Sequence, residues 1–334
     1  MTQPTLLVDT SFLGDVLCAE PLVRAVAAQH AGPVDFLAAP GGAALLANHP
    51  DLRQVLVYDK RGADRGLGGL RRMAAALRAR GYGRAICSHR SWRTAVLLRL
   101  ARIPERVGFD NASAAWLYSR REPYRKDRHE IERNLALAGG GAWERPRVHP
   151  GPQERARAAS LAPEPPFVAL APGSIWPTKR WPAQRWAELT AALAESGVAV
   201  VLIGGPEDRE LAAEIRRLAG EPERVVDLCG ATSLRESYAV LELAAALVSN
   251  DSAPMHLGVA AGIPVLAVYC STVPEFGFAP RGKADRVFQV DGLACRPCGV
   301  HGRQTCPEKH FRCGLDTAAE AVLGALRPLL ATPV

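Results

Sequence analysis

The feature that most constrains the fold is a series of short apolar runs, each followed by an amphipathic helical pattern. Val198–Ile203 and Pro264–Tyr269 are apolar on nearly every consecutive residue. A strand of this kind needs cover on both faces, as in a parallel sheet that lies between two layers of helices. The series occurs twice, on either side of a Pro-rich stretch at about 145–166. The sequence therefore predicts an α/β fold with two doubly wound sheets.

The pattern divides the 334 residues into domains at 1–155 and 166–334, with a linker at about 145–166. The other predicted strands are Leu6–Asp9, Val34–Ala38, Gln54–Tyr58, Ala85–Ser88, Arg106–Phe109, Phe167–Ala171, Arg224–Leu228 and Leu247–Asn250. The predicted helices include Asp15–His30, Leu67–Arg80, Trp92–Arg102, Ala183–Ser196, Glu207–Ala219, Ser233–Ala245 and Pro254–Ala261. Ligands of doubly wound sheets bind beyond the carboxyl ends of the strands, so we expect functional residues directly after strands.

The charge of the chain is unevenly distributed. Residues 1–150 hold 23 Lys and Arg against 14 Asp and Glu, a net charge of +9, whereas residues 151–334 hold 18 against 20. This asymmetry predicts an anionic partner for the first half. An Arg-rich genome is the alternative, but it explains a preference for Arg over Lys rather than the placement of the excess. We do not expect this anionic partner to be a nucleic acid.

No apolar run approaches the ~20 residues of a transmembrane helix, and the N-terminal stretch lacks the basic start of a signal peptide. We therefore expect a cytoplasmic protein. The chain also lacks G-x-G-x-x-G after its first strand, G-x-x-x-x-G-K-[ST], H-E-x-x-H and G-x-S-x-G. Their absence argues against nicotinamide-dependent oxidoreductases, P-loop enzymes, zinc proteases and α/β-hydrolases.

Three polar motifs follow predicted strands. The first is Ser11–Asp15, in which Gly14 permits a tight turn and Asp15 opens the next helix. A carboxylate there can accept a proton from a hydroxyl group, although an ordinary helix cap is the alternative. The second is Ala171–Pro182, which contains Lys179, one of five lysines in the chain. A flexible ammonium suits a diphosphate whose charge grows during a reaction, and a solvated loop lysine is the alternative.

The third motif, Ser249–His256, lies between an apolar strand and a helix. Pro254 suits the first turn of that helix and Ser252 or Asp251 suits its cap, so its free N–H groups can bind an anion. A normally capped helix is the alternative. A weaker signal, Glu207, follows another strand and could contact ribose hydroxyls.

Together these motifs resemble glycosyltransferase family 9, the family of the ADP-heptose:lipopolysaccharide heptosyltransferases. The matching segments are SxxGD after the first strand, PGSxWPTKRWP at the start of the second domain, NDSxPMH before a late helix, and HEIERNLALAG at 129–139. The resemblance covers nearly the whole chain. It implies a GT-B fold of two Rossmann-like domains that face a cleft. It also implies inverting transfer from an ADP-sugar without a catalytic metal.

The resemblance implies a role for each matching residue. Asp15 corresponds to the general base and Lys179 to the phosphate-binding lysine. The expected donor-binding residues are Gly14, Ser174, Lys179, Glu207, Asp251, Ser252, Ala253, Met255 and His256. Two departures affect the donor site, because Ala253 replaces a usual Gly and Cys270–Thr272 replaces a Gly-Pro-Thr/Ser run.

The acceptor implied by the resemblance is an anionic, lipid-linked oligosaccharide at the inner face of the cytoplasmic membrane. Candidate contacts in the basic half are Lys60, Arg61, Arg90, Arg93 and Arg121. Three alternatives stay open: a relative that uses another sugar donor or a protein acceptor, a sugar-nucleotide epimerase on the same GT-B scaffold, and a nucleotide-sugar-binding protein without catalysis.

Four of the eight cysteines form a cluster at Cys295, Cys298, Cys306 and Cys313. In a cytosolic protein such a group favours metal over disulfides, and four thiolates suit structural zinc or iron. The spacing is not that of a standard zinc ribbon, so reduced thiols or a fortuitous disulfide are the alternatives. If metal is bound, we expect a closed site without a catalytic role.

Overall fold

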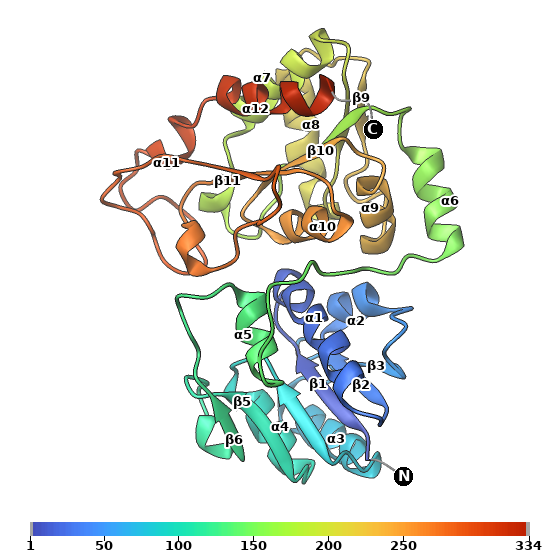
Figure 1. Ribbon diagram of the computed structural model, residues 1–334. Coiled ribbons are helices and arrows are strands. Elements are labelled where there is room, and N and C mark those ends of the chain that lie inside the picture. Colours follow the sequence, from blue (N-terminus) through green and yellow to red (C-terminus); the bar gives the residue numbers. More distant parts are fainter. Residues whose placement is uncertain (1–2, 332–334) are drawn as a thin grey trace. The chain divides into compact units, whose positions relative to one another are not determined.

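The computed structural model describes residues 3–331, which form two compact units divided between His149 and Pro150. Each unit contains one six-stranded sheet in which all strand pairs are parallel (Figure 1). The units are described separately below.

In the first unit the strand order is β3-β2-β1-β4-β5-β6. The strands are β1 (Thr5–Asp9), β2 (Val34–Ala38), β3 (Gln54–Val57), β4 (Arg84–Cys87), β5 (Glu105–Phe109) and β6 (Arg120–Glu122). The helices are α1 (Leu13–Gln29), α2 (Pro40–Leu46), α3 (Gly66–Ala79), α4 (Trp92–Leu100), η1 (Ala115–Leu117) and α5 (Glu130–Ala136). His129 caps α5, since it accepts a hydrogen bond from Ile131 N–H while its own N–H donates to Glu132.

In the second unit the order is β12-β11-β10-β7-β8-β9. The strands are β7 (Phe167–Ala171), β8 (Ala199–Leu202), β9 (Val225–Asp227), β10 (Ala246–Asn250), β11 (Val265–Tyr269) and β12 (Arg286–Gln289). The α-helices are α6 (Pro152–Leu161), α7 (Ala183–Glu195), α8 (Arg209–Leu218), α9 (Leu234–Leu241), α10 (Ala253–Ala261), α11 (Arg312–Leu315) and α12 (Ala319–Ala331). Three 3₁₀ turns are η2 (Pro177–Lys179), η3 (Pro206–Asp208) and η4 (Pro274–Phe276).

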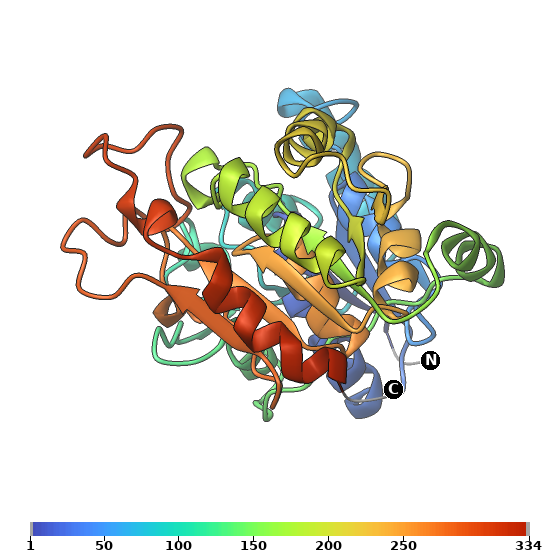
Figure 2. The same cartoon turned by 90° about the horizontal axis from the view of Figure 1, so that it is seen from above.

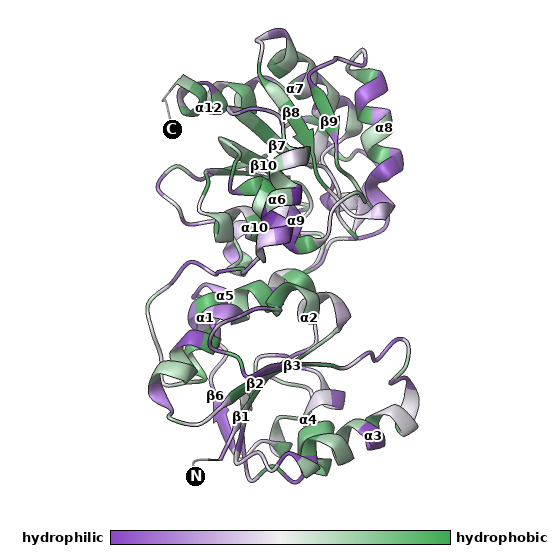
Figure 3. Cartoon of the chain, turned by 90° about the vertical axis from the view of Figure 1, so that its right-hand side faces the viewer, coloured by the Kyte–Doolittle hydropathy of each residue, from purple (hydrophilic) through white to green (hydrophobic). Residues whose placement is uncertain are grey.

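Helices cover the central strands of the second sheet. Figure 2 shows α7 and α12 side by side over the strands, and their contact is extensive. The residues of β7, β10 and β11 are all buried. In Figure 3 these apolar strands contrast with α8, whose outer face is hydrophilic. Consecutive apolar residues thus identify the inner strands because helices cover both of their faces.

The order of strands reverses at one point in each sheet. β1 leads to β2 and β3 on one side, while β4 lies on its other side; in the second sheet β7 and β10 have the same relation. At such a point the connections leave the sheet in opposite directions and open a crevice beyond the strand ends. The motifs after β1, β7 and β10 all begin at these points.

Three features differ from the sequence interpretation. The linker region contains α6, which packs on α9 and forms ion pairs from Glu154 to Arg235 (2.6 Å) and from Arg157 to Glu236 (3.1 Å). The strand β12 follows β11 and was not among the predicted strands. The predicted helix at 207–219 begins as η3 and becomes α-helical at Arg209. Among residues 3–331, no helix is both long and apolar enough to cross a bilayer.

The helix α10 lies unusually close to the sheet at Gly258. A Cβ atom at this position would lie 2.5 Å from Leu247 Cδ2 and 3.0 Å from Val265 Cγ2. Both side chains are fully buried and have little room to move. The glycine therefore sets the distance between β10 and the helix whose first turn forms part of the candidate site.

We expect Gly258→Ala to lower the free energy of unfolding by about 1–3 kcal/mol, the usual cost of overpacking a core. This cost opposes the ~1 kcal/mol by which alanine normally favours a helix over glycine. Gly324→Ala is the matched control, because its added Cβ in α12 meets no atom within 4 Å. Urea denaturation measures both; a Gly258→Ala variant as stable as the control would contradict this packing argument.

Candidate functional site

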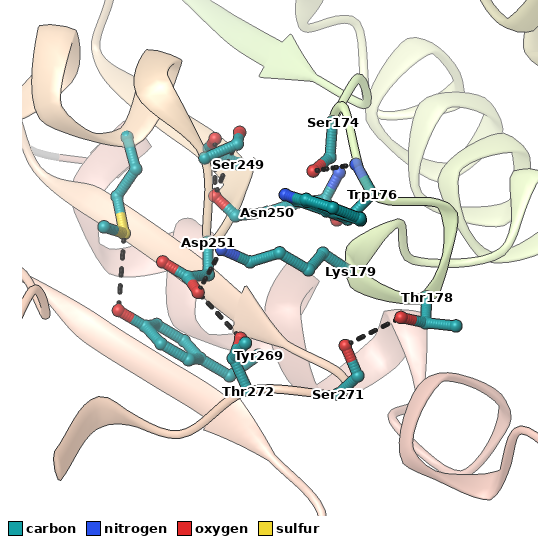
Figure 4. A network of polar contacts seen from close by, with 12 residues as sticks. Ser174, Trp176, Thr178, Lys179, Ser249, Asn250, Asp251, Tyr269, Ser271 and Thr272 are labelled. Atoms are coloured by element: carbon teal, nitrogen blue, oxygen red, sulfur yellow. Dashed lines mark hydrogen bonds and ion pairs between the residues drawn. The ribbon is translucent and has the colours of Figure 1, made fainter. Parts of the chain in front are cut away.

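The loops after β7 and β10 are connected by the side chain of Asn250, the last residue of β10, which Figure 4 shows near Lys179 and Asp251. Its Oδ1 accepts a hydrogen bond from Trp181 N–H at 2.9 Å, and its Nδ2 donates to Pro172 O at 2.7 Å. Asn250 is fully buried, so both bonds are shielded from water. The amide therefore fixes the loop that carries Lys179 beside the end of β10. The sequence interpretation placed Asn250 in a motif but gave it no role.

Lys179 and Asp251 form the charged centre of this site. Lys179 Nζ lies 2.6 Å from Asp251 Oδ2, and the Thr272 hydroxyl donates to the same oxygen at 2.7 Å (Figure 4). The side chains of Lys179 and Asp251 are 14% and 11% exposed, so the ammonium can still be reached from solvent. Thr272, which the sequence interpretation did not select, thus orients the carboxylate of the pair.

The first turn of α10 adjoins this ion pair. Ser252 occupies the N-cap position, but its side chain does not cap the helix; its hydroxyl donates instead to Asn250 O at 3.4 Å. The first turn begins with Ala253, while Pro254 lacks an N–H group and Met255 N–H donates to Ser252 O at 3.1 Å. A helix start without a side-chain cap presents backbone N–H groups to an anion. The motif therefore has the geometry of an anion site.

His256 is buried on the same turn. Burial lowers the pKa of its imidazole to about 4, and Lys179 adds to this effect while Asp251 opposes it. The ring is therefore neutral at physiological pH. Its ring also lies edge-on to Phe278, with 6.1 Å between the centroids. A neutral ring adds no positive charge to the site, so the charge on this side comes from Lys179.

Ser174 lies in the loop after β7, and its hydroxyl accepts a hydrogen bond from Trp176 N–H at 3.4 Å. Arg180 Nε donates to Ser174 O at 2.8 Å, so two neighbouring residues hold the loop in place. Ser174 is partly exposed at the same strand end as Lys179 and Asp251. The structure thus brings these three predicted donor-binding residues together.

The carboxylates after β8 have different environments. Glu207 is exposed on η3, whereas Asp208 is buried and accepts a hydrogen bond from Gly205 N–H at 3.0 Å. Burial raises the pKa of Asp208. Its carboxyl group fills the space that a Cβ atom would need at Gly173 or Gly204. Asp208 therefore packs between two loops, and Glu207 is the carboxylate that remains open to a ligand.

In the first unit, the motif after β1 is built around Asp9. Its carboxylate accepts hydrogen bonds from the backbone and side chain of Ser11 and from the Ser88 hydroxyl, the last at 2.6 Å. Ser88 follows β4, so Asp9 connects the two strands at the reversal point. Asp9 is buried, and nothing in the motif spacing indicated this role.

Asp15 lies in the first turn of α1, directly after Gly14. Its carboxylate accepts a hydrogen bond from Phe12 N–H at 3.3 Å. Loss of water contact raises the pKa of Asp15 to about 7, and the nearby charges of Asp9 and Glu130 contribute in the same direction. A carboxylate with a pKa near the working pH is a more effective general base than an ordinary aspartate. Three acidic groups thus share one small region.

Glu130 belongs to a buried network at the start of α5. Its Oε2 accepts hydrogen bonds from Arg133 Nη1 at 2.8 Å and from the Tyr124 hydroxyl at 2.7 Å. The guanidinium of Arg90 lies over the Tyr124 ring, 4.1 Å from its centroid. Arg90, a predicted acceptor contact, therefore packs on Tyr124, which the sequence interpretation did not select.

The other predicted acceptor contacts have two kinds of environment. Lys60 Nζ donates to Thr10 O and Oγ1 at 2.8 and 2.9 Å, and burial lowers its pKa. Arg93 donates to the Tyr58 hydroxyl at 2.9 Å and to two backbone carbonyls. Arg61 and Arg121 are exposed. Lys60 and Arg93 thus support the loops around the site, while the two exposed arginines are open to an anion.

Among residues 3–331, one group of His, Cys, Asp or Glu side chains brings three ligand atoms within 4.8 Å of one another: Glu20, His49 and His149. Asp51 N–H donates to His49 Nδ1, so the ring carries its proton on Nε2 and donates to Glu20 at 3.0 Å. Arg24 Nε also donates to this carboxylate at 2.9 Å. The group is satisfied by these hydrogen bonds, and Arg24 would repel a cation there.

The four clustered cysteines lie within electrostatic reach of one another. Burial raises the pKa of Cys298, and the neighbouring Cys295 and Cys306 raise it further. Burial followed by Cys298 raises the pKa of Cys313 to about 11. Cys295 Sγ also lies 3.9 Å from His310 Nε2. In the described part of the chain, no three of these ligand atoms meet the 4.8 Å spacing noted above.

Two units, each with a parallel six-stranded sheet whose strand order reverses once, form a fold of the GT-B type. The comparison with known sequences agrees: glycosyltransferase family 9 (heptosyltransferase) matches residues 70–310, and the chain belongs to this family. The family resemblance and the fold class predicted from the motifs are thereby confirmed.

The similarity to individual relatives covers most of the chain. Lipopolysaccharide heptosyltransferase 2 of Salmonella typhimurium is 27% identical over 291 residues, which cover 81% of this chain and 84% of the relative. The structure of the E. coli ADP-heptose lipopolysaccharide heptosyltransferase II superimposes with a TM-score of 0.81, 25% identity and 98% coverage of both chains. A second E. coli heptosyltransferase, solved with ADP, gives a TM-score of 0.72 at 25% identity and covers 98% of this chain and 99% of that one.

The environment of Asp15 predicts a titration near neutral pH. Because its pKa is raised to about 7, the carboxyl group should be protonated below pH 7 and charged above it. Carboxyl-carbon NMR of the folded protein measures this midpoint. Glu130→Gln should lower the midpoint, since it removes one nearby negative charge. Glu144→Gln is the control, because that carboxylate is paired with Arg24 on the surface. A midpoint near pH 4 in the unmodified protein would contradict the assignment.

Proposed function

We propose that the protein transfers a heptose from ADP-heptose to an acceptor in the lipopolysaccharide core. The observation that carries the proposal is the combination of Lys179, Ser174 and the uncapped start of α10 at one point of strand reversal. These groups suit the diphosphate of a nucleotide sugar. Heptosyltransferase relatives, one of which is solved with ADP, support the choice of sugar and nucleotide.

The proposed donor site stabilises the leaving group. As the bond between the anomeric carbon and the diphosphate breaks, its electron pair passes to ADP. Lys179 and the backbone N–H groups near Ser252 face this growing charge. Asp251 and His256 lie beside the sugar, and Glu207 contacts the ribose hydroxyls. Lys179 supplies the charge that a metal ion provides in other transferases, so we propose that no catalytic metal is used.

The proposed base is Asp15. The acceptor hydroxyl attacks the anomeric carbon from the face opposite the diphosphate, which inverts the configuration, and Asp15 takes its proton. A pKa of about 7 suits this role, because the group is charged at physiological pH but still binds a proton well. Asp9 and Glu130 act through the charge that they place near Asp15.

The proposed acceptor is anionic and lipid-linked, in agreement with the net charge of +9 over residues 1–150. Arg61 and Arg121 are exposed and suit acidic groups on the acceptor, while Lys60, Arg90 and Arg93 shape the surface around them. A lipid-linked acceptor brings the protein to the cytoplasmic face of the inner membrane. Basic side chains near such a surface each add ~1 kcal/mol of attraction.

Two variants test the proposal when purified protein is given ADP-heptose and core acceptor, with the product measured by mass spectrometry. Lys179→Ala should weaken ADP binding by about 10- to 100-fold, the cost of a charge-assisted contact, and should reduce turnover. Asp15→Asn should keep ADP affinity but lose about 10²- to 10⁴-fold in turnover, as for other general bases.

Calorimetry with ADP separates binding from catalysis in both variants. Turnover that persists in Asp15→Asn would remove this residue from the mechanism, and unchanged ADP affinity in Lys179→Ala would contradict the donor site. Binding of ADP-heptose without any transfer would favour a non-catalytic nucleotide-sugar-binding protein. Transfer from another donor or to a protein would identify a different member of the family.

We further propose that Cys295, Cys298, Cys306 and Cys313 bind one structural zinc or iron ion. The four thiols are close enough for their charges to influence one another's pKa. Bound metal would deprotonate the thiols and stabilise a segment that has little core of its own. Elemental analysis of protein purified without chelators should find one metal per chain. Protein that is fully folded with neither zinc nor iron would contradict this proposal.

A further inference from the structure

The segment Cys295–Arg303, which contains two of the clustered cysteines, folds back onto the loops of the donor site. Cys298 N–H donates to Ser271 O at 2.9 Å, and Thr178 N–H donates to Arg303 O at 3.2 Å. Thr178 directly precedes Lys179, and Ser271 directly precedes Thr272. The segment therefore contacts the chain on both sides of the Lys179–Asp251 pair.

The Thr178 hydroxyl connects the segment Cys295–Arg303 to the loops that carry Lys179 and Thr272. It accepts a hydrogen bond from Arg303 N–H at 2.7 Å and lies 3.0 Å from Arg303 O and 3.1 Å from Ser271 Oγ (Figure 4). Thr178 is 4% exposed. Few water molecules can replace these bonds, so their loss should be felt at Lys179, the next residue.

Gly302 forms the surface on which the Lys179 stem lies. A Cβ atom at Gly302 would lie 3.0 Å from Lys179 Cγ and from Ser271 Oγ, and 3.1 Å from Thr178 Oγ1. The residue also has a φ of +81°, which disfavours any side chain. A glycine here allows the lysine stem to reach Asp251 along the segment.

The other member of the pair is held from the same segment. Arg296 Nη2 donates to Thr272 O at 2.6 Å and to Tyr269 O at 3.3 Å. Thr272 in turn donates through its hydroxyl to Asp251. Arg296 therefore fixes the backbone of the residue that orients the Asp251 carboxylate.

We propose that Cys295–Arg303 is a positioning element for Lys179 and Asp251, so that donor affinity depends on the conformation of this segment. Gly302 and Thr178 are positioning residues that act through Lys179. The proposal rests on the donor-binding role proposed for Lys179. It also changes the expectation for the cysteines, because a change at Cys295 or Cys298 acts on the donor site as well as on stability.

The first test replaces Gly302. Gly302→Ala should weaken ADP binding by about tenfold, part of the cost of losing a charge-assisted contact. The matched control is Gly292→Ala, which has a similar φ of +73° but no atom within 4 Å of the added Cβ. Calorimetry with ADP and thermal melting are compared for both. Equal ADP affinity in the two variants would overturn the proposal.

A double-mutant cycle separates positioning from general loss of structure. In a Lys179→Ala background, Gly302→Ala should weaken ADP binding by less than about twofold, because its effect passes through the missing lysine. A further tenfold loss in that background would show an effect independent of Lys179 and overturn the proposal. If Lys179→Ala alone left ADP affinity unchanged, the proposed donor site itself would fail.

Thr178 provides a test without added bulk. Thr178→Val removes the hydroxyl but keeps the shape of the side chain, whereas Thr178→Ser keeps the hydroxyl. We expect Thr178→Val to raise the ADP dissociation constant about tenfold and Thr178→Ser to restore it. Equal affinity in the two variants would contradict the role of this hydroxyl, even if both were less stable.

Discussion

The buried amide of Asn250 is the interaction on which the arrangement of the donor loops depends. One side chain accepts from Trp181 N–H and donates to Pro172 O, so it connects β10 to both ends of the loop after β7. No apolar side chain could replace it, because the two backbone groups would then lose their partners in a buried position. The amide also explains why Lys179 and Asp251, distant in sequence, form a close ion pair. Asn250 thus holds the loop that carries Lys179 beside the end of β10.

In the first unit, the main electrostatic feature is the raised pKa of Asp15. Asp15 has a raised pKa because it is shielded from water and because Asp9 and Glu130 lie nearby. Each neighbour has its own compensation: Asp9 accepts hydrogen bonds from Ser11 and Ser88, and Glu130 pairs with Arg133. Asp15 itself accepts a hydrogen bond from Phe12 N–H. The raised pKa thus belongs to the carboxylate that we propose as the base.

The inner strands could be predicted because burial on both faces leaves a continuous apolar run, as in Phe167–Ala171. Two of the four edge strands in the described residues, β6 and β12, were not predicted, since Arg120–Glu122 and Arg286–Gln289 are short and include charged or polar residues. The helix α6 was hidden by the prolines around it, which are compatible with a first helical turn as well as with a linker. Motif spacing predicted Asp15 and Lys179 as site residues, and these roles stay proposals. The roles of Asp9, Asn250 and Glu130 depend on contacts across the fold, which no local pattern contains.

The cysteine-bearing segment shows how a loop without helices or strands can have a defined structure. Residues 290–311 form no regular element, and Figure 2 shows this part extending away from the sheet. Hydrogen bonds from Cys298, Arg303 and Arg296 nevertheless fix one side of it to the donor loops. These hydrogen bonds form only while the loop keeps its conformation. The few apolar residues of the loop cannot stabilise that conformation alone. Any link among the thiols would reduce the entropy of the free loop and so strengthen its hold on Thr178 and Thr272. The conformational stability of the segment and the position of Lys179 are therefore coupled.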